Sequence, residues 1–177
     1  MKNLVFIAFI VLVSCKSKVI QYPVNYDNDR EKFMEFSQNL NKQILEEDNQ
    51  LIENYIDSLG RKFTKTSYGF WISNSGNPTA TTANTGDLVQ FTSQISRFDN
   101  EIVYSEEETG TQSVLLGKTD IPRGVHIALQ LIEKGDSATV LFPSFMVYGS
   151  FGDQNKIFGN EPLIYKIHML DIKKNNR

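Results

Sequence analysis

Cysteine and histidine are scarce in this 177-residue sequence. Its single cysteine is Cys15, and its two histidines are His126 and His168. One cysteine cannot form a disulfide within a single chain, and it leaves no second thiol for a metal site. The histidines lie far apart in the sequence, so we expect them to be solvated or to have capping roles. The sequence also lacks a Gly-rich phosphate loop and a Gly-x-Ser-x-Gly motif. We therefore expect no metal and no cofactor.

An excess of positive charge is also absent. Lys and Arg total 18 against 21 Asp and Glu, a formal net charge of −3, so nothing attracts nucleic acid in general. The acidic run SEEETG, residues 105–110, is more typical of a solvated loop than of a cation site. Because 40% of the residues are hydrophobic, the chain has enough apolar surface for one domain with a buried core.

Long apolar runs are missing except at the N-terminus, where LVFIAFIVLV follows the basic residue Lys2. This run is too short to span a bilayer core of roughly 30 Å, and its flanks are typical of a secretory signal. It ends in LVSC, which resembles the bacterial lipobox; an ordinary signal peptide containing a cysteine is the alternative. We expect residues 1–14 to be a lipoprotein signal peptide and Cys15 to be lipidated.

The segment that follows changes from extended to helical. Residues 15–28 contain Pro23 and show no amphipathic period, which predicts an extended tether. In residues 29–63 apolar side chains recur at spacings of three and four, which predicts one long or two broken helices with Gly60 as the C-cap. The apolar stripe fits either a partner helix, as in a homodimer, or the protein's own domain.

Residues 64–177 are the predicted folded domain. The apolar spacing of residues 123–134 predicts one helix, ended by Gly135, and residues 75–86 lack large apolar side chains and are a predicted loop. Aromatic and β-branched runs predict strands at 68–74, 88–95, 101–105, 111–117, 137–142 and 162–172. These elements indicate an α+β domain in which a curved antiparallel sheet wraps one short helix.

The stretch LLGKTDIPRGVHIALQLIEKGDSATVLFPSFMVYG, from Leu115 to Gly149, resembles the FKBP-type peptidyl-prolyl isomerase family. The matching features stand at the family spacing without a gap: Leu116-Gly117-Lys118, Gly124, Ala128-Leu129, Gly135, Pro143 and Tyr148-Gly149. The resemblance extends over residues 68–174. It implies an FKBP-like domain that isomerises X-Pro bonds without a cofactor, acting on proline-containing peptides and unfolded exported proteins.

The N-terminal half narrows this resemblance. A lipobox, an acidic helical segment and the stretch TKTSYGFWISNSG are similar to exported FKBP-type lipoproteins associated with bacterial gliding motility. More distantly, they are similar to periplasmic members with a dimerising helical region. This similarity implies a lipid-anchored protein of the cell envelope that faces the periplasm, with a homodimer through the N-terminal helices.

Site residues are also implied by the resemblance. Tyr148 matches a tyrosine whose hydroxyl binds a carbonyl of the peptide, and Phe91 and Tyr165 match two aromatic positions of the pocket wall. We expect these three to be the catalytic residues. Five further positions are expected to bind substrate: Tyr104, Ile121, Pro122, Val125 and Ile157.

Several of these positions depart from the family pattern. Tyr104 stands where the family has an aspartate, with Asp99 and Glu101 as alternative carboxylates. Val125 replaces a tryptophan that many members carry. Pro122 occupies a position whose N–H binds the ligand, and proline has no N–H. Losing one hydrogen bond costs about 0.5–1.5 kcal/mol, so a weakly catalytic or non-catalytic peptide-binding protein is the alternative function.

Lipidation can be tested at Cys15. In a bacterium that processes lipoproteins, Cys15→Ser is expected to abolish fatty-acid labelling of the protein, because a serine hydroxyl does not replace the thiol that carries the lipid. Gel detection of an incorporated alkyne fatty acid measures this. Ser14→Ala, which keeps a small residue before the cysteine, is the matched control and should stay labelled. A labelled Cys15→Ser variant would show that the lipobox interpretation is wrong.

Overall fold

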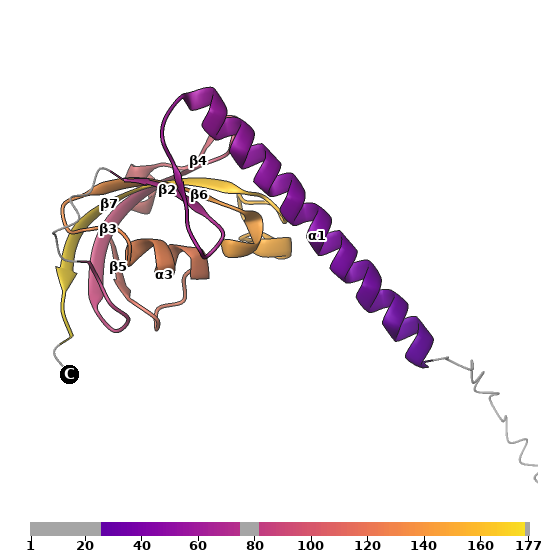
Figure 1. The fold of residues 1–177 in the computed structure, drawn as a ribbon. Coiled ribbons are helices and arrows are strands. Elements are labelled where there is room, and N and C mark those ends of the chain that lie inside the picture. Colours follow the sequence, from indigo (N-terminus) through magenta and orange to yellow (C-terminus); the bar gives the residue numbers. More distant parts are fainter. Residues whose placement is uncertain (1–25, 75–81, 176–177) are drawn as a thin grey trace, which may run out of the picture. The chain divides into compact units, whose positions relative to one another are not determined.

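The computed structural model describes residues 26–74 and 82–175 (Figure 1). It contains two compact units, Met1–Phe36 and Ser37–Arg177, and the second holds the whole sheet. The predicted signal peptide, Cys15 and nearly all of the predicted tether lie outside the described residues, as does most of the predicted loop at 75–86. Within the part that is described, no helix is both long and apolar enough to cross a membrane.

Helix α1 (Tyr26–Leu59) is continuous, which is one of the two predicted arrangements. Gly60 follows it with a φ of +60°, a left-handed conformation that commonly ends helices. In the second unit, Ile52 of α1 is completely buried. It lies in a small cluster with three residues of the sheet: Trp71, Leu141 and Ile164. This part of the helix therefore packs on its own domain.

Seven strands form one antiparallel sheet in the order β1-β2-β6-β7-β3-β4, with β5 also paired to β3. The strands are β1 (Thr64–Lys65), β2 (Trp71–Asn74), β3 (Leu88–Ser96), β4 (Ile102–Tyr104), β5 (Gln112–Leu115), β6 (Ser137–Phe142) and β7 (Leu163–Lys173). β3 pairs with β7 along the whole length of β3. On its other side, β5 and β4 pair with the two ends of β3. The predicted α+β architecture is confirmed.

The remaining helices are short: α2 (Glu106–Thr109), α3 (Arg123–Leu129) and the 3₁₀ turns η1 (Ser144–Met146) and η2 (Gly149–Phe151). The predicted end of α3 at residue 134 is wrong, because the chain turns toward the sheet after Leu129. Glu133 forms a β-bridge with Thr82, and the Gly135 N–H donates to the carbonyl of Met169 in β7. Glu133 therefore pairs with a segment outside the strands and Gly135 with β7, instead of both continuing the helix.

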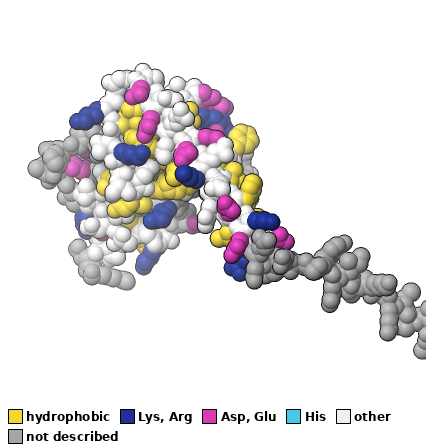
Figure 2. Space-filling view, turned by 45° about the vertical axis from the view of Figure 1, so that its right-hand side comes forward, with side chains coloured by type: hydrophobic (Ala, Val, Ile, Leu, Met, Phe, Trp, Pro, Cys, Tyr) yellow, Lys and Arg dark blue, Asp and Glu magenta, His cyan; other side chains and the backbone are white. Residues whose placement is uncertain are grey.

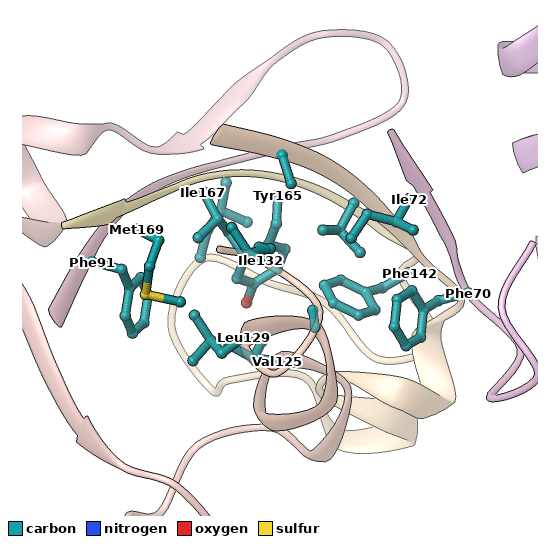
Figure 3. Close-up of a cluster of buried hydrophobic side chains, with 14 of the residues drawn as sticks. Phe70, Ile72, Phe91, Val125, Leu129, Ile132, Phe142, Tyr165, Ile167 and Met169 are labelled. Atoms are coloured by element: carbon teal, nitrogen blue, oxygen red, sulfur yellow. The ribbon is translucent and has the colours of Figure 1, made fainter. Parts of the chain in front are cut away.

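The main core lies between the sheet and α3 (Figure 3). Phe142 is in ring contact with both Phe70 and Tyr165, with centroids 5.1 and 5.3 Å away. Leu129 of α3 is completely buried, as is Ile132 just beyond the helix. Each such apolar side chain contributes about 1.5–3 kcal/mol when it is fully buried. This core fixes α3 across the sheet.

Charged side chains of both signs are interspersed on the face of the molecule shown in Figure 2. This is consistent with the formal net charge of −3. The face presents no extended basic surface of the kind that binds nucleic acid through its phosphates.

A buried carboxylate joins α1 to the segment after β6. Asp48 is only 5% exposed, and its Oδ2 accepts hydrogen bonds from the N–H and the hydroxyl of Ser144, at 2.8 and 2.7 Å. Burial raises the pKa of Asp48, although the hydrogen bonds from Ser144 act in the opposite direction. Because Pro143 offers no side-chain cap to η1, the cap comes from α1 instead.

Removing this cap is expected to destabilise the fold. Asp48→Ala should lower the free energy of unfolding by about 1–3 kcal/mol, since it leaves two buried donors unpaired. Asp48→Asn keeps an acceptor oxygen and should lose less. Urea denaturation measures both, with Asp57→Ala, an exposed carboxylate on the same helix, as a control expected to change stability by at most about 0.5 kcal/mol. Equal stability of the two alanine variants would contradict the capping role.

Candidate active site

A pocket of about 520 Å³ opens between β3, β4, β7, α2, the start of α3 and the segments on either side of η2. Most of its lining is aromatic or aliphatic: Phe91, Ile95, Tyr104, Ile121, Pro122, Val125, Tyr148 and Tyr165. The polar part of the lining comes from five residues: Ser93, Glu108, Thr109, Gln112 and Asp153. The pocket can therefore hold an apolar ring while polar groups contact the adjoining peptide.

Seven of the eight residues predicted to act on or bind substrate line this pocket: Phe91, Tyr104, Ile121, Pro122, Val125, Tyr148 and Tyr165. Ile157 is the exception. Its side chain is 3% exposed and belongs to the main core instead of the lining. Its backbone still contributes, because the Ile157 N–H donates to Asp153 at 2.8 Å. The predicted lipidation residue, Cys15, lies outside the described residues.

Strand geometry brings the aromatic wall together. Phe91, Ser93 and Ile95 alternate along β3 and line the pocket, because successive strand side chains point to opposite faces. Tyr165 on β7 is paired with Ile95, and its hydroxyl donates to the Tyr148 hydroxyl at 3.4 Å. Burial raises the pKa of Tyr165 well above its usual value, and Tyr148 adds to that rise. The Tyr165 phenol therefore stays protonated at neutral pH.

The floor of the pocket is the start of α3. Pro122 is the N-cap residue of that helix and has no N–H to donate. The preceding amide, that of Ile121, donates to the carbonyl of Thr119 at 3.0 Å. Neither residue therefore offers a backbone donor to a bound peptide, as the sequence predicts for Pro122.

Close packing sets the distance between this floor and Tyr148. A Cβ atom on Gly124 would lie 2.7 Å from the carbonyl oxygen of Met146 and 2.9 Å from the ring of Phe142. Only glycine allows α3 and η1 to approach so closely. Val125 follows Gly124 directly, and Tyr148 comes two residues after Met146, so this contact determines the width of the pocket.

A tyrosine and a carboxylate form the opposite wall. The Tyr104 hydroxyl donates to Asp153 Oδ2 at 2.5 Å and accepts from Asn155 Nδ2 at 3.1 Å. The hydrogen bond to Asp153 raises the pKa of Tyr104, and burial adds to the rise. Burial acts to raise the pKa of Asp153, but hydrogen bonds from Tyr104 and from three backbone N–H groups prevail and lower it.

Asp153 is a site residue that the sequence interpretation missed. The alternatives Asp99 and Glu101 are wrong, because neither lines the pocket. Asp99 accepts from the N–H of Glu101 in the turn after β3, and Glu101 pairs with Arg97 at 2.7 Å. The available signal was the pair Gly152-Asp153, which closely follows Tyr148 and provides both a turn and an acidic group.

Both histidines make local structural contacts. His126 accepts from the Gly117 N–H at 3.3 Å, and its other ring nitrogen lies 2.9 Å from the carbonyl of Thr119. His168 lies 2.9 Å from the hydroxyl of Ser137 on the neighbouring strand. Over residues 26–74 and 82–175, no group of three or more His, Cys, Asp or Glu is arranged to hold a metal ion.

Comparison with known proteins shows the family and the fold. The profile of the family described as FKBP-type peptidyl-prolyl cis-trans isomerase matches residues 79–170, more than half of the chain. A peptidyl-prolyl cis-trans isomerase from Pseudomonas syringae pv. tomato str. DC3000 is 17% identical with a TM-score of 0.62, covering 75% of this chain and 96% of its own. FkpA from Escherichia coli is 17% identical with a TM-score of 0.61, covering 86% of this chain and 73% of its own.

At this identity the two structures establish the fold, while the family match covers every pocket-lining residue. The chain belongs to the FKBP-type peptidyl-prolyl cis-trans isomerase family and is an enzyme of that type.

Proposed function

We propose that this isomerase acts on X-Pro bonds of exported, unfolded proteins in the cell envelope, where lipidated Cys15 anchors it to a membrane on the periplasmic side. We further propose that it serves a gliding-motility or envelope machine. The observation that supports the site assignment is the convergence of seven predicted residues on one apolar pocket. The N-terminal run and LVSC support export and anchoring.

The reaction needs an environment instead of a nucleophile. Rotation about an X-Pro amide crosses a barrier of about 18–20 kcal/mol, because it breaks the resonance of the C–N bond. The twisted amide carries less charge separation than either planar isomer. A pocket that desolvates the prolyl ring and favours this less polar state therefore lowers the barrier, provided that it binds the planar isomers less well.

Four pocket residues have a place in this scheme. Phe91, Tyr165 and Val125 provide the apolar surface for the prolyl ring. The Tyr148 hydroxyl accepts a hydrogen bond from the hydroxyl of Tyr165. Because a phenol can accept one hydrogen bond and donate another, the Tyr148 proton is available to a carbonyl of the peptide. No covalent step is required of any side chain.

A weakly catalytic or non-catalytic peptide-binding function is the second candidate. This function is favoured by the floor of the pocket. Pro122 has no N–H, and the N–H of Ile121 already donates a hydrogen bond to the carbonyl of Thr119. A peptide carbonyl therefore loses one donor there, and Tyr148 becomes more important for binding.

Catalysis is testable with variants of Tyr148 in the chain from residue 16 onward. NMR exchange spectroscopy on a proline peptide should show catalysis by the wild type. Tyr148→Phe, which loses one hydrogen bond, should lower kcat/KM by roughly two- to tenfold, and Tyr148→Ala should lower it further. Tyr68→Phe alters a tyrosine that lies outside the pocket lining and should change nothing. A wild-type rate equal to that in buffer would favour the binding function.

We also propose a homodimer through α1. Phe33, Phe36 and Leu40 follow helical spacing and are exposed by 67%, 65% and 44%. An apolar stripe of this kind is typical of a helix that packs on another helix.

The dimer can be tested by analytical ultracentrifugation. The wild type is expected to sediment with twice the monomer mass, and Leu40→Glu is expected to shift it to the monomer, because a carboxylate would be buried in the stripe. Gln38→Glu adds the same charge away from the stripe and should leave the dimer intact. A monomeric wild type at high micromolar concentration would contradict the proposal.

A further inference from the structure

The charged side chains that line the pocket are all acidic. Glu108 and Asp153 are the charged residues of the lining, and among the lining residues that the structure describes there is no Lys, Arg or His. Tyr104 connects the two carboxylates. It donates to Asp153, and the Lys156 ammonium lies 4.7 Å from its ring centroid and 2.5 Å from Glu108 Oε1. The wall is therefore one connected group.

The two carboxylates differ in whether a positively charged side chain is paired with them. Lys156 offsets the charge of Glu108 in an ion pair whose partners are 42% and 47% exposed. Asp153 instead has neutral partners: the Tyr104 hydroxyl and the N–H groups of Asn155 and Ile157. In the described part of the chain, no Lys or Arg forms an ion pair with it.

Asp153 is therefore a charged group in the lining of the pocket. Its lowered pKa, in which the hydrogen bonds prevail over burial, keeps it ionised at neutral pH. Its hydrogen-bond partners in the described part of the chain are backbone N–H groups and a phenol, and the nearby Lys156 ammonium pairs with Glu108 instead. Asp153 thus adds a carboxylate without an ion-pair partner, among the described residues, to a pocket whose floor is apolar.

We propose that this wall makes the isomerase prefer proline bonds flanked by Lys or Arg over those flanked by Glu or Asp. The inference rests on the proposed function: if the prolyl ring lies against Phe91, Tyr165 and Val125, the residue next to it can extend toward Asp153 and Glu108, which line the same pocket. Attraction between partly solvated charges is modest, so the preference is one of degree.

The experiment compares two series of short acetylated peptides, Xaa-Pro and Pro-Xaa, with Xaa as Lys, Gln or Glu. NMR exchange spectroscopy gives kcat/KM without a coupling protease, which has charge preferences of its own. At low salt we expect kcat/KM to decrease from the Lys peptide to the Gln peptide to the Glu peptide in at least one series. Each unit of charge should change kcat/KM by roughly two- to fivefold. In 1 M salt, where the Debye length is about 3 Å, the steps should shrink.

Two variants that should change the ratio of kcat/KM for the Lys and Glu peptides in opposite directions test the roles of Asp153 and Glu108. Asp153→Asn is nearly isosteric and should bring the Lys to Glu ratio toward one, whereas Lys156→Gln exposes the charge of Glu108 and should increase the ratio. Glu107→Gln, which removes a carboxylate from the same short helix but outside the lining, should leave it unchanged. Using the ratio cancels any general loss of activity.

Two results would overturn the proposal: equal wild-type rates for the three peptides in both series, or a Lys to Glu ratio that Asp153→Asn leaves intact. Catalysis of the Gln peptide separates this proposal from the function on which it rests. If the Gln peptide is isomerised without any charge order, only the substrate preference fails. If none of the peptides is isomerised, both proposals fail.

Discussion

The close contact between α3 and η1 at Gly124 is the constraint on which the pocket depends. It places the α3 backbone against the carbonyl of Met146 and the ring of Phe142, with no room for a side chain at residue 124. Any larger residue would push α3 outward and separate Val125 from Tyr148. Because Phe142 also packs on Tyr165, the same contact aligns the aromatic wall with the floor. The position of α3 relative to the sheet therefore depends on the close approach that Gly124 allows.

Two further glycines, Gly152 and Gly159, shape the loop that holds Asp153. A Cβ on Gly152, whose φ is +65°, would lie 2.1 Å from the Ile157 carbonyl oxygen, and a Cβ on Gly159 would lie 2.2 Å from that of Ser150. This tight loop directs the Asn155 and Ile157 N–H groups at Asp153, and Asp153 in turn holds Tyr104. A carboxylate that the family pattern places on a strand is therefore replaced here by one from a loop, whose conformation depends on glycine.

Local pattern predicted the parts of the fold that depend on local physics. The alternation of β3 and β7 and the apolar spacing of α3 and α1 identified these elements, and the family spacing identified seven pocket residues. The errors have a common cause in long-range contacts. α3 ends early because Gly135 finds a partner in Met169, and Asp153 reaches Tyr104 across 49 residues. Ile157 packs into the core although its position in the sequence matches a pocket residue. None of these partners is encoded by spacing.

The departures from the family pattern have unequal consequences for catalysis. A hydrogen bond from a backbone N–H at the floor to a peptide carbonyl would exist with the planar substrate and with the twisted state alike, so its absence at Pro122 weakens binding of both. Uniform weakening raises KM and leaves the barrier of the bound state unchanged. The aromatic wall of Phe91 and Tyr165 acts differently, because desolvation favours the less polar twisted amide over the planar one. In the proposed mechanism, the part of the pocket that acts on the barrier is therefore the part this chain retains, while the polar groups available to a peptide are Tyr148 and the Tyr104–Asp153 pair instead of a backbone N–H at the floor.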